Sequence, residues 1–203
     1  MKIALIGATG NVGRRLLAEA TRRGHRVTAI ARKVDDLAPA EGVTAAAGDL
    51  ADEAGMAALL RDHEAVILSV RFRTLDVETI LRAVRASGVP RLLVVGGAAS
   101  LEVAPGQALV DTPDFPEFIK PEALPARAAL ERLRREAELD WTYLSPSVFF
   151  GPGERTGRFR LGADGLLSDA DGKSHISYED YAIAMLDEVE QPRHRRTRFT
   201  VGY

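Results

Sequence analysis

The chain contains no cysteine among its 203 residues. This absence excludes disulfide bridges, thiolate nucleophiles and cysteine-ligated metal sites, and it agrees with a reducing compartment. Histidine is also scarce, and no pair of the four histidines has the spacing of metal ligands. We therefore expect no metal site, and we expect surface or turn positions for His25, His63, His175 and His194.

Long hydrophobic runs and an excess of charge of one sign are missing too. No apolar run approaches the ~18 residues of a membrane span, and residues 3–6 are too short for the core of a signal peptide. The formal net charge of −2 gives no field that would attract nucleic acid or an anionic membrane. We expect a cytoplasmic protein without nucleic-acid or membrane partners, folded as one domain over residues 1–203.

The most informative stretch is residues 2–13, which read KIALIGATGNVG. Four apolar residues run into Gly7, Gly10 and Gly13, and a helical apolar pattern follows, which together indicate a strand, a tight turn and a helix. In such a turn the first glycine permits the sharp bend, the second permits close approach of a pyrophosphate, and the third permits helix packing. We expect this segment to bind a dinucleotide at the helix N-terminus, with Thr9, Asn11 and Val12 beside the phosphates. The alternative is a glycine-rich turn that binds nothing.

Strands and helices alternate along the rest of the chain. We expect strands at residues 26–30, 43–47, 91–95 and 197–201, one strand within 64–70 and one within 140–153, and helices at 51–61, 74–87, 126–138 and 178–190. This order predicts an α/β fold, a Rossmann-type doubly wound parallel sheet in three α/β/α layers, with a small C-terminal region on the substrate side. The ligand crevice of such a sheet lies at the carboxyl ends of the strands, where Ser69 and Arg71 leave the fourth strand.

The choice between the two nicotinamide cofactors is decided after the second strand. An acidic residue there favours NAD, whereas a basic residue accommodates the 2′-phosphate of NADP. The chain has Arg32 and Lys33 at this point, and its first acids, Asp35 and Asp36, come late. We expect NADP(H) to be preferred over NAD(H); the alternative is that these two cations lie in a solvated loop.

Four segments together carry a resemblance to a known family. They are the glycine turn, Gly48-Asp49-Leu50, Gly96-Gly97-Ala98-Ala99-Ser100 and residues 145–157. They resemble the atypical branch of the short-chain dehydrogenase/reductase superfamily, near the NmrA-like proteins and the NADH-flavin reductases related to biliverdin reductase B.

The resemblance implies roles for several residues. Asp49 would accept a hydrogen bond from the adenine amino group, and Leu50 would pack on the adenine ring. Gly96 and Gly97 would border the cofactor. The nicotinamide end would contact Pro146, Ser147 and Val148. As an alternative, Asp49 could cap the helix that follows it.

The chain departs from the catalytic members of that superfamily. The Tyr-x-x-x-Lys pair is absent, because the residues four positions after Tyr143, Tyr178 and Tyr181 are not lysines. Gly97 stands where the catalytic serine would be, with Ser100 nearby. Ordinary alcohol or ketone chemistry is therefore not expected, and the sequence assigns no catalytic residue.

The second half contains three further features. Residues 101–125 hold five prolines and little periodicity, which indicates a long binding loop or a surface excursion. Arg155, Arg158 and Arg160 form a basic group, either for the phosphate of a substrate such as FMN or in a solvated loop. Residues 169–172 have the composition of a hairpin turn between short strands.

Two functions agree with these observations. The first is an oxidoreductase that transfers hydride from NADPH to a small flat acceptor, a flavin such as FMN or a quinone, whose reduction does not require a Tyr-Lys acid. The second is a non-catalytic NADP(H)-binding redox sensor of the NmrA-like type. The sequence leaves the acceptor and a homodimer open.

Overall fold

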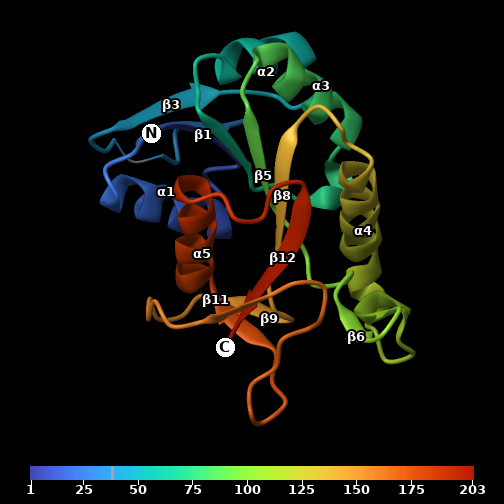
Figure 1. Cartoon of the computed structure of the whole chain (residues 1–203). Helices are drawn as coiled ribbons and strands as arrows, with labels where there is room; N and C mark the ends of the chain where they lie inside the picture. Colours follow the sequence, from blue (N-terminus) through green and yellow to red (C-terminus); the bar gives the residue numbers. More distant parts are fainter. Residues whose placement is uncertain (38) are drawn as a thin grey trace.

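The computed structural model describes residues 1–37 and 39–203. Its centre is an eight-stranded sheet with the order β10-β12-β8-β5-β4-β1-β2-β3 (Figure 1). The parallel strands are β1 (Lys2–Ile6), β2 (Arg26–Ala31), β3 (Val43–Ala47), β4 (Ala65–Leu68), β5 (Arg91–Val95), β8 (Asp140–Ser145) and β12 (Thr197–Gly202). The edge strand β10 (Arg160–Gly162) runs antiparallel to β12. The mostly parallel α/β sheet that the alternation predicts is confirmed.

Helices cover both faces of this sheet. On one face lie α1 (Asn11–Arg22) and α5 (Tyr178–Glu190), which pack against each other. The other face carries α2 (Glu53–Leu60), α3 (Val77–Ser87) and α4 (Lys120–Arg134) (Figure 1). Side chains of β1 alternate between the two cores, with Ile3 and Leu5 on the α1 side and Ala4 and Ile6 on the α2 side. A central strand buried on both faces has to be apolar throughout, and residues 3–6 are.

The strand order reverses between β1 and β4. The chain first builds β1, β2 and β3 outward in one direction, and then returns to place β4, β5 and β8 on the other side of β1. At such a reversal the loops from neighbouring strands diverge, which opens a crevice at the carboxyl ends of the strands. This is the point at which the glycine turn leaves β1.

The proline-rich stretch is more ordered than expected. It contains β6 (Glu102–Ala104), β7 (Gln107–Ala108) and the 3₁₀ helices η2 (Leu109–Asp111) and η3 (Glu117–Ile119). The helix that follows begins at Lys120, six residues earlier than predicted. Pro121 lies in its first turn, where no backbone N–H is required, and Pro125 interrupts only one internal hydrogen bond. The predicted start of this helix was wrong because residues 101–125, including both prolines, were assigned to a loop.

The hairpin predicted around residues 169–172 was also wrong. A turn does form, because the Asp169 carboxylate accepts hydrogen bonds from the backbone N–H groups of Asp171 and Lys173. The strands on either side of it do not pair with each other. Instead β10 joins β12, and β11 (His175–Ser177) pairs in parallel with β9 (Phe149–Gly151).

The predicted start of the last helix is confirmed. Ser177 is the N-cap of α5 and accepts from the backbone N–H of Asp180. Two of the histidines are buried rather than at the surface: His25 contacts Glu190, and His63 contacts the Thr28 hydroxyl. Within residues 1–37 and 39–203 no group of His, Asp or Glu side chains could hold a metal ion. No helix in that part of the chain has the length and apolar character needed to cross a membrane.

Candidate functional site: a cofactor cleft and an adjoining apolar pocket

Two of the three glycines in the turn after β1 are required by the fold itself. Gly7 has a φ of +85°, and a Cβ atom there would lie 2.0 Å from the carbonyl oxygen of Ser69. A Cβ atom on Gly13 would lie 2.1 Å from the carbonyl oxygen of Gly7. A side chain at either position would collide with backbone, so these two glycines allow β1, the turn and α1 to pack closely.

Gly10 differs from its two neighbours. Its φ of −69° and ψ of 167° are open to any residue, and a Cβ atom would be 3.4 Å from the nearest atom, the Gly7 carbonyl oxygen. The folded chain therefore does not need a glycine here. Gly10 lies on the wall of a cleft, where the missing side chain leaves space for a ligand.

The N-terminus of α1 is suited to an anion. Its N-cap, Gly10, has no side chain to accept from the first N–H groups, and the first turn contains no acid. In contrast, Asp52, Asp76 and Ser177 cap α2, α3 and α5 with side-chain oxygens. The unpaired N–H groups and the helix dipole therefore fit the pyrophosphate of a dinucleotide.

The cleft beside this helix end has a volume of about 540 Å³. Seven of the predicted binding residues line it, namely Gly7, Gly10, Arg32, Asp49, Leu50, Ser69 and Arg71. Sequence reasoning missed Val70, Thr74, Asp76 and Thr79, although their position between the end of β4 and the first turn of α3 could have placed them at this edge. The cleft therefore runs from the glycine turn across the ends of β2, β3 and β4.

The remaining residues predicted around the turn do not line the cleft. Thr9 uses its carbonyl oxygen to accept from Arg14 Nε at 2.9 Å, and Asn11 is exposed. Val12 packs against the core on the α1 side of the sheet. Lys33 is exposed and lies outside the lining, whereas Arg32 is part of it. Of the two cations after β2, the structure therefore brings Arg32 to the cleft.

Asp49 remains at the cleft because another residue caps the next helix. The N-cap of α2 is Asp52, whose carboxylate accepts from the backbone N–H of Gly55 at 2.9 Å. Asp49 is exposed and accepts from the N–H of Ala51 at 3.0 Å. The alternative in which Asp49 caps α2 is therefore wrong. The Asp49 carboxylate borders the part of the cleft formed by Leu50.

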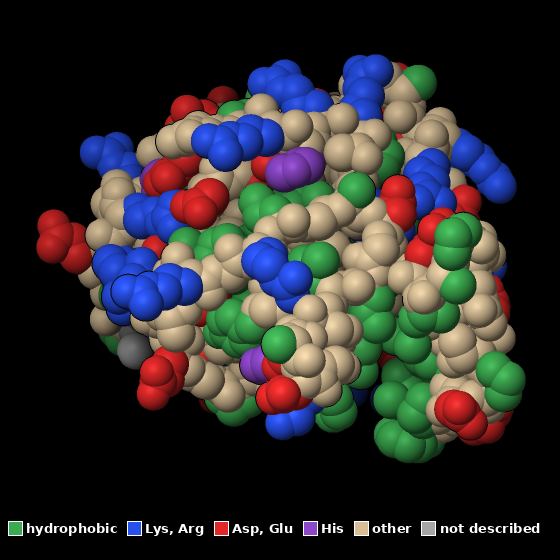
Figure 2. Space-filling view, turned by 60° about the horizontal axis from the view of Figure 1, so that its bottom comes forward, with side chains coloured by type: hydrophobic (Ala, Val, Ile, Leu, Met, Phe, Trp, Pro, Cys, Tyr) green, Lys and Arg blue, Asp and Glu red, His purple; other side chains and the backbone are tan. Residues whose placement is uncertain are grey.

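A second cavity of about 260 Å³ adjoins the cleft. Val70 and Arg71 line both cavities, so the two share a wall. Five predicted residues line this second cavity: Gly96 and Gly97, which were expected to border the cofactor, and Pro146, Ser147 and Val148, which were expected to contact the nicotinamide end. Figure 2, which brings this end of the molecule forward, shows hydrophobic side chains gathered along a hollow at the lower right. We call this second cavity the apolar pocket.

The rest of the lining comes from segments far apart in the chain. Phe72 follows β4, Phe115 and Ile119 belong to the proline-rich stretch, and Phe150 belongs to β9. Phe115 packs in a small separate hydrophobic cluster with Ala99, Val110 and Ala123. The proline-rich stretch therefore forms a wall of this pocket. This agrees with the hypothesis that residues 101–125 are a binding loop.

The floor of the apolar pocket depends on a buried tyrosine. A Cβ atom on Gly96 would lie 2.1 Å from the Tyr143 ring. The Tyr143 hydroxyl accepts from the Gly97 N–H at 3.1 Å and donates to the Ala126 carbonyl oxygen at 3.2 Å. Burial of the phenol raises the pKa of Tyr143 above its ordinary value. Tyr143 is therefore a supporting residue and not a proton donor to a ligand.

The pocket wall offers few groups for acid–base chemistry. Among its described lining residues the ionisable side chains are Arg71 and Glu122. The carboxylate of Glu122 accepts from the backbone N–H groups of Phe72 at 2.6 Å and Arg73 at 3.3 Å. The Ser147 hydroxyl donates to the Val201 carbonyl oxygen at 3.0 Å. The pocket can hold a flat apolar group but has no evident proton donor for it.

The basic group at residues 155–160 has mostly other partners. Arg155 forms an ion pair with buried Glu19 at 2.9 Å, and this hydrogen bond lowers the pKa of Glu19 to about 2. Arg160 donates to the carbonyl oxygens of Ser168 and Tyr203. Two of the three arginines thus already bind other groups of the protein. This favours the interpretation of the segment as a solvated loop over its interpretation as a site for the FMN phosphate.

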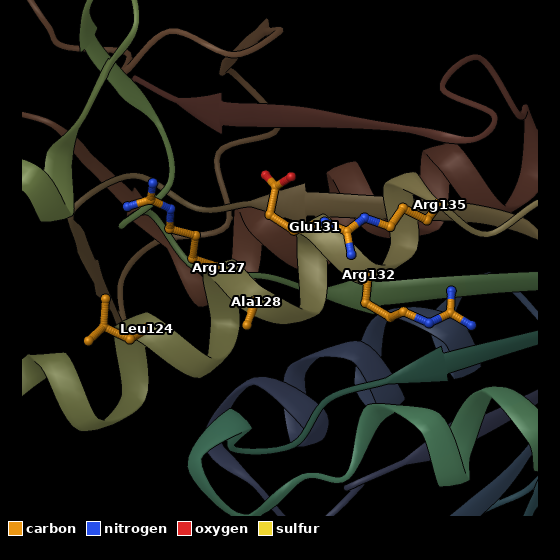
Figure 3. Close-up of a pocket in the computed structure, with 6 residues that line it drawn as sticks. All are labelled: Leu124, Arg127, Ala128, Glu131, Arg132 and Arg135. Carbon is orange, nitrogen blue, oxygen red and sulfur yellow. The ribbon is translucent and has the colours of Figure 1, made fainter.

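Another hollow lies on the outer side of α4, away from the crevice. Leu124, Arg127, Ala128, Glu131, Arg132 and Arg135 line it (Figure 3). Arg127 is paired with Asp111, and Arg132 is paired with Glu78 and Glu136. Because these guanidinium groups already have carboxylate partners, the hollow is a salt-bridged surface rather than a candidate site.

The sheet order, the glycine turn and the uncapped helix end define a Rossmann-type NAD(P)-binding protein. A sequence model described as "NAD(P)H-binding" matches residues 7–192. The chain belongs to this NAD(P)H-binding family.

Relatives and solved structures agree with this assignment. The "Uncharacterized protein YwnB" of Bacillus subtilis is 40% identical, over 99% of this chain and 98% of its own length. A "putative exported protein" of Burkholderia pseudomallei has a structure similar to this chain, with 46% identity, a TM-score of 0.91 and full coverage of both chains. A "putative NADH-flavin reductase" of Streptococcus pneumoniae is 35% identical, with a TM-score of 0.89, over 100% of this chain and 99% of that one.

Proposed function

We propose that this protein is an oxidoreductase that transfers hydride from NADPH to a small flat acceptor, a flavin or a quinone. The observation that carries the proposal is the shared wall between the two cavities. A cleft with a phosphate-binding helix end opens beside an apolar pocket, and Val70 and Arg71 border both. A dinucleotide in the cleft would therefore extend its nicotinamide end toward the pocket.

NADPH, when bound, supplies the hydride, and the chain's own residues hold and orient the reactants. The α1 N-terminus would hold the pyrophosphate, and Gly97 would let a ring lie close to the backbone. Phe72, Phe115 and Phe150 provide apolar cover that excludes water from a flat acceptor. The name of the streptococcal relative supports a flavin as one such acceptor.

We also propose that NADPH is preferred over NADH. Arg32 follows β2, lines the cleft and is exposed, while Asp35 and Asp36 lie outside the lining. A guanidinium group at this position suits a 2′-phosphate, and a carboxylate would repel it.

The remaining expectations stay proposals. We propose that residues 1–203 form one domain and that the protein is cytoplasmic, because a chain without cysteine fits a reducing compartment. Limited proteolysis and cell fractionation test these two statements; the name of the Burkholderia relative makes the second test worth doing early.

The deciding experiment follows NADPH oxidation by the absorbance of the nicotinamide, with FMN, riboflavin and a simple quinone offered in turn. Turnover of ~1 per second or more with one of them, in the ordinary enzyme range, would support the reductase and identify the acceptor class. Tight binding of NADPH without turnover would favour the alternative, an NADP(H)-binding redox sensor. Failure to bind either nicotinamide cofactor would refute both.

A further inference from the structure

Arg71 holds a distinctive position between the two cavities. It lies in the loop after β4, and with Val70 it is one of two residues that line both the cofactor cleft and the apolar pocket. Its side chain is exposed and forms no hydrogen bond or ion pair with any residue in the described part of the chain. The guanidinium group is therefore available to a ligand in either cavity.

The backbone next to Arg71 is held firmly. The 3₁₀ helix η1 (Phe72–Thr74) begins at the following residue, and both oxygens of Glu122 on α4 accept from its N–H groups. The Phe72 ring is buried and packs near Tyr143, with 6.1 Å between the ring centroids. The start of the Arg71 side chain is thus fixed, whereas its charged end remains free.

Charge in the apolar pocket is unevenly distributed. Glu122 and Arg71 are the ionisable residues of its described lining, and both oxygens of the Glu122 carboxylate are engaged by backbone N–H groups. The positive charge of Arg71 has no such partner. Among the described lining residues, the charged group that is free to hydrogen-bond a ligand in the pocket is therefore the cation.

The proton balance of hydride transfer makes this charge useful. A C–H bond of the reduced nicotinamide breaks, its hydrogen leaves with both electrons, and a new bond to hydrogen forms on the acceptor. The acceptor thereby gains one negative charge. Because Tyr143 and Ser147 donate to backbone carbonyl oxygens, neither is placed to protonate it. The negative charge persists until a proton arrives from water.

We propose that Arg71 stabilises the negative charge that develops on the acceptor, and that the substrates are therefore acceptors whose hydride adduct is a delocalised anion. This inference rests on the proposed reductase function. Reduced flavins and hydroquinones belong to this class. Aldehydes and ketones do not, because an alkoxide needs a proton during the transfer.

A binding experiment tests the role of Arg71 without turnover. The probes are 2-naphthoate and 2-naphthamide, which have nearly the same shape and differ in charge, titrated into the protein–NADP⁺ complex by calorimetry. We expect the wild type to prefer the anion by ~10-fold, the lower end of what a charge-assisted hydrogen bond contributes, because the exposed guanidinium is screened by solvent. Arg71→Gln should abolish the preference, and Arg71→Lys should retain part of it.

Kinetic measurements complete the test with a matched control. Arg71→Gln should lower kcat with 1,4-naphthoquinone by ~10-fold or more, while the Kd for NADPH changes less than ~3-fold. Arg73→Gln removes another exposed cation two residues away that lines neither cavity, and it should change neither kcat nor the Kd for NADPH. The wild type should reduce 1,4-naphthoquinone and leave 2-naphthaldehyde unchanged.

Three results would be decisive. If Arg71→Gln weakens NADPH binding as much as it slows turnover, Arg71 is a cofactor ligand only and the inference is overturned. An unchanged preference for 2-naphthoate in Arg71→Gln would also overturn it. If the preference depends on Arg71 but no variant turns over any acceptor, the reductase proposal fails while the anion site at Arg71 is supported.

Discussion

A single methyl group at Gly10 would separate cofactor binding from folding. Gly10→Ala introduces a Cβ atom 3.4 Å from the nearest atom, at backbone angles that alanine adopts without strain. Alanine is a poorer N-cap than glycine, but it also lowers the entropy of the unfolded chain. These two effects oppose each other, so the free energy of unfolding should change by less than ~1 kcal/mol.

Cofactor binding should respond strongly to the same change. The new methyl group stands on the wall of the cleft, at the helix end that would hold the pyrophosphate. Displacing a phosphate from one charge-assisted hydrogen bond costs ~1.5–3 kcal/mol, which corresponds to an NADPH affinity ~10- to 150-fold weaker. Titration of NADPH fluorescence gives the Kd, and urea unfolding of the same preparation gives the stability.

Two other glycines serve as matched controls. Gly13→Ala would place a methyl carbon 2.1 Å from the Gly7 carbonyl oxygen, so it should cost ~3 kcal/mol of stability or more. Gly165→Ala has no atom within 4 Å and should alter neither stability nor binding. The reasoning would be refuted by a Gly10→Ala protein that is as stable as the wild type and binds NADPH equally well.

Three further predictions concern single side chains. Arg32→Ala should weaken the binding of NADPH by ~10-fold or more and leave the binding of NADH nearly unchanged, since a charge-assisted hydrogen bond to phosphate contributes ~1.5–3 kcal/mol. Lys33→Ala should change the affinity for neither cofactor. Equal losses of affinity for both cofactors in Arg32→Ala would show that Arg32 does not bind the 2′-phosphate. Glu19→Gln should lower the free energy of unfolding at pH 7 by ~2 kcal/mol. This is less than a fully buried ion pair would contribute, because Arg155 is partly exposed and solvent screens its charge. Because the pKa of Glu19 is lowered from 4.5 to about 2, the wild type should lose this contribution as the pH falls from 4.5 toward 2, whereas a parallel fall in the variant would contradict it. Tyr143→Phe should lower the free energy of unfolding, measured in urea, by ~1–2 kcal/mol, because it removes the oxygen that accepts from the Gly97 N–H. The kcat per folded molecule should not fall. A large loss of kcat would instead indicate that Tyr143 is catalytic.

The sequence predicted the sheet well because its evidence is local. Residues 43–47 and 91–95 were assigned with the bounds that β3 and β5 have in the structure. Their apolar character and the following turns depend only on neighbouring residues. The start of α4 could not be predicted in this way, since Pro121 is tolerated only because of its place in the first turn of the helix.

The candidate site was predictable on the cofactor side and much less so on the acceptor side. The cleft is built from the ends of consecutive strands, so a motif such as Gly48-Asp49-Leu50 identifies its members one at a time. The apolar pocket instead combines Phe72, Phe115 and Phe150, from three segments that only tertiary packing brings together. Nothing in the local pattern around any of these residues indicates that they face the same cavity.

Tyr143 shows why a missing motif does not decide the chemistry by itself. The sequence established only that no lysine follows this tyrosine by four residues. In the structure its ring lies where any side chain at position 96 would be, and its hydroxyl joins Gly97 to α4. A tyrosine whose hydroxyl is hydrogen-bonded within the floor of the pocket cannot also donate a proton to a ligand above that floor. The same contacts that shape the pocket for a flat ring therefore prevent Tyr143 from acting as a proton donor there, and they favour acceptors that tolerate a negative charge.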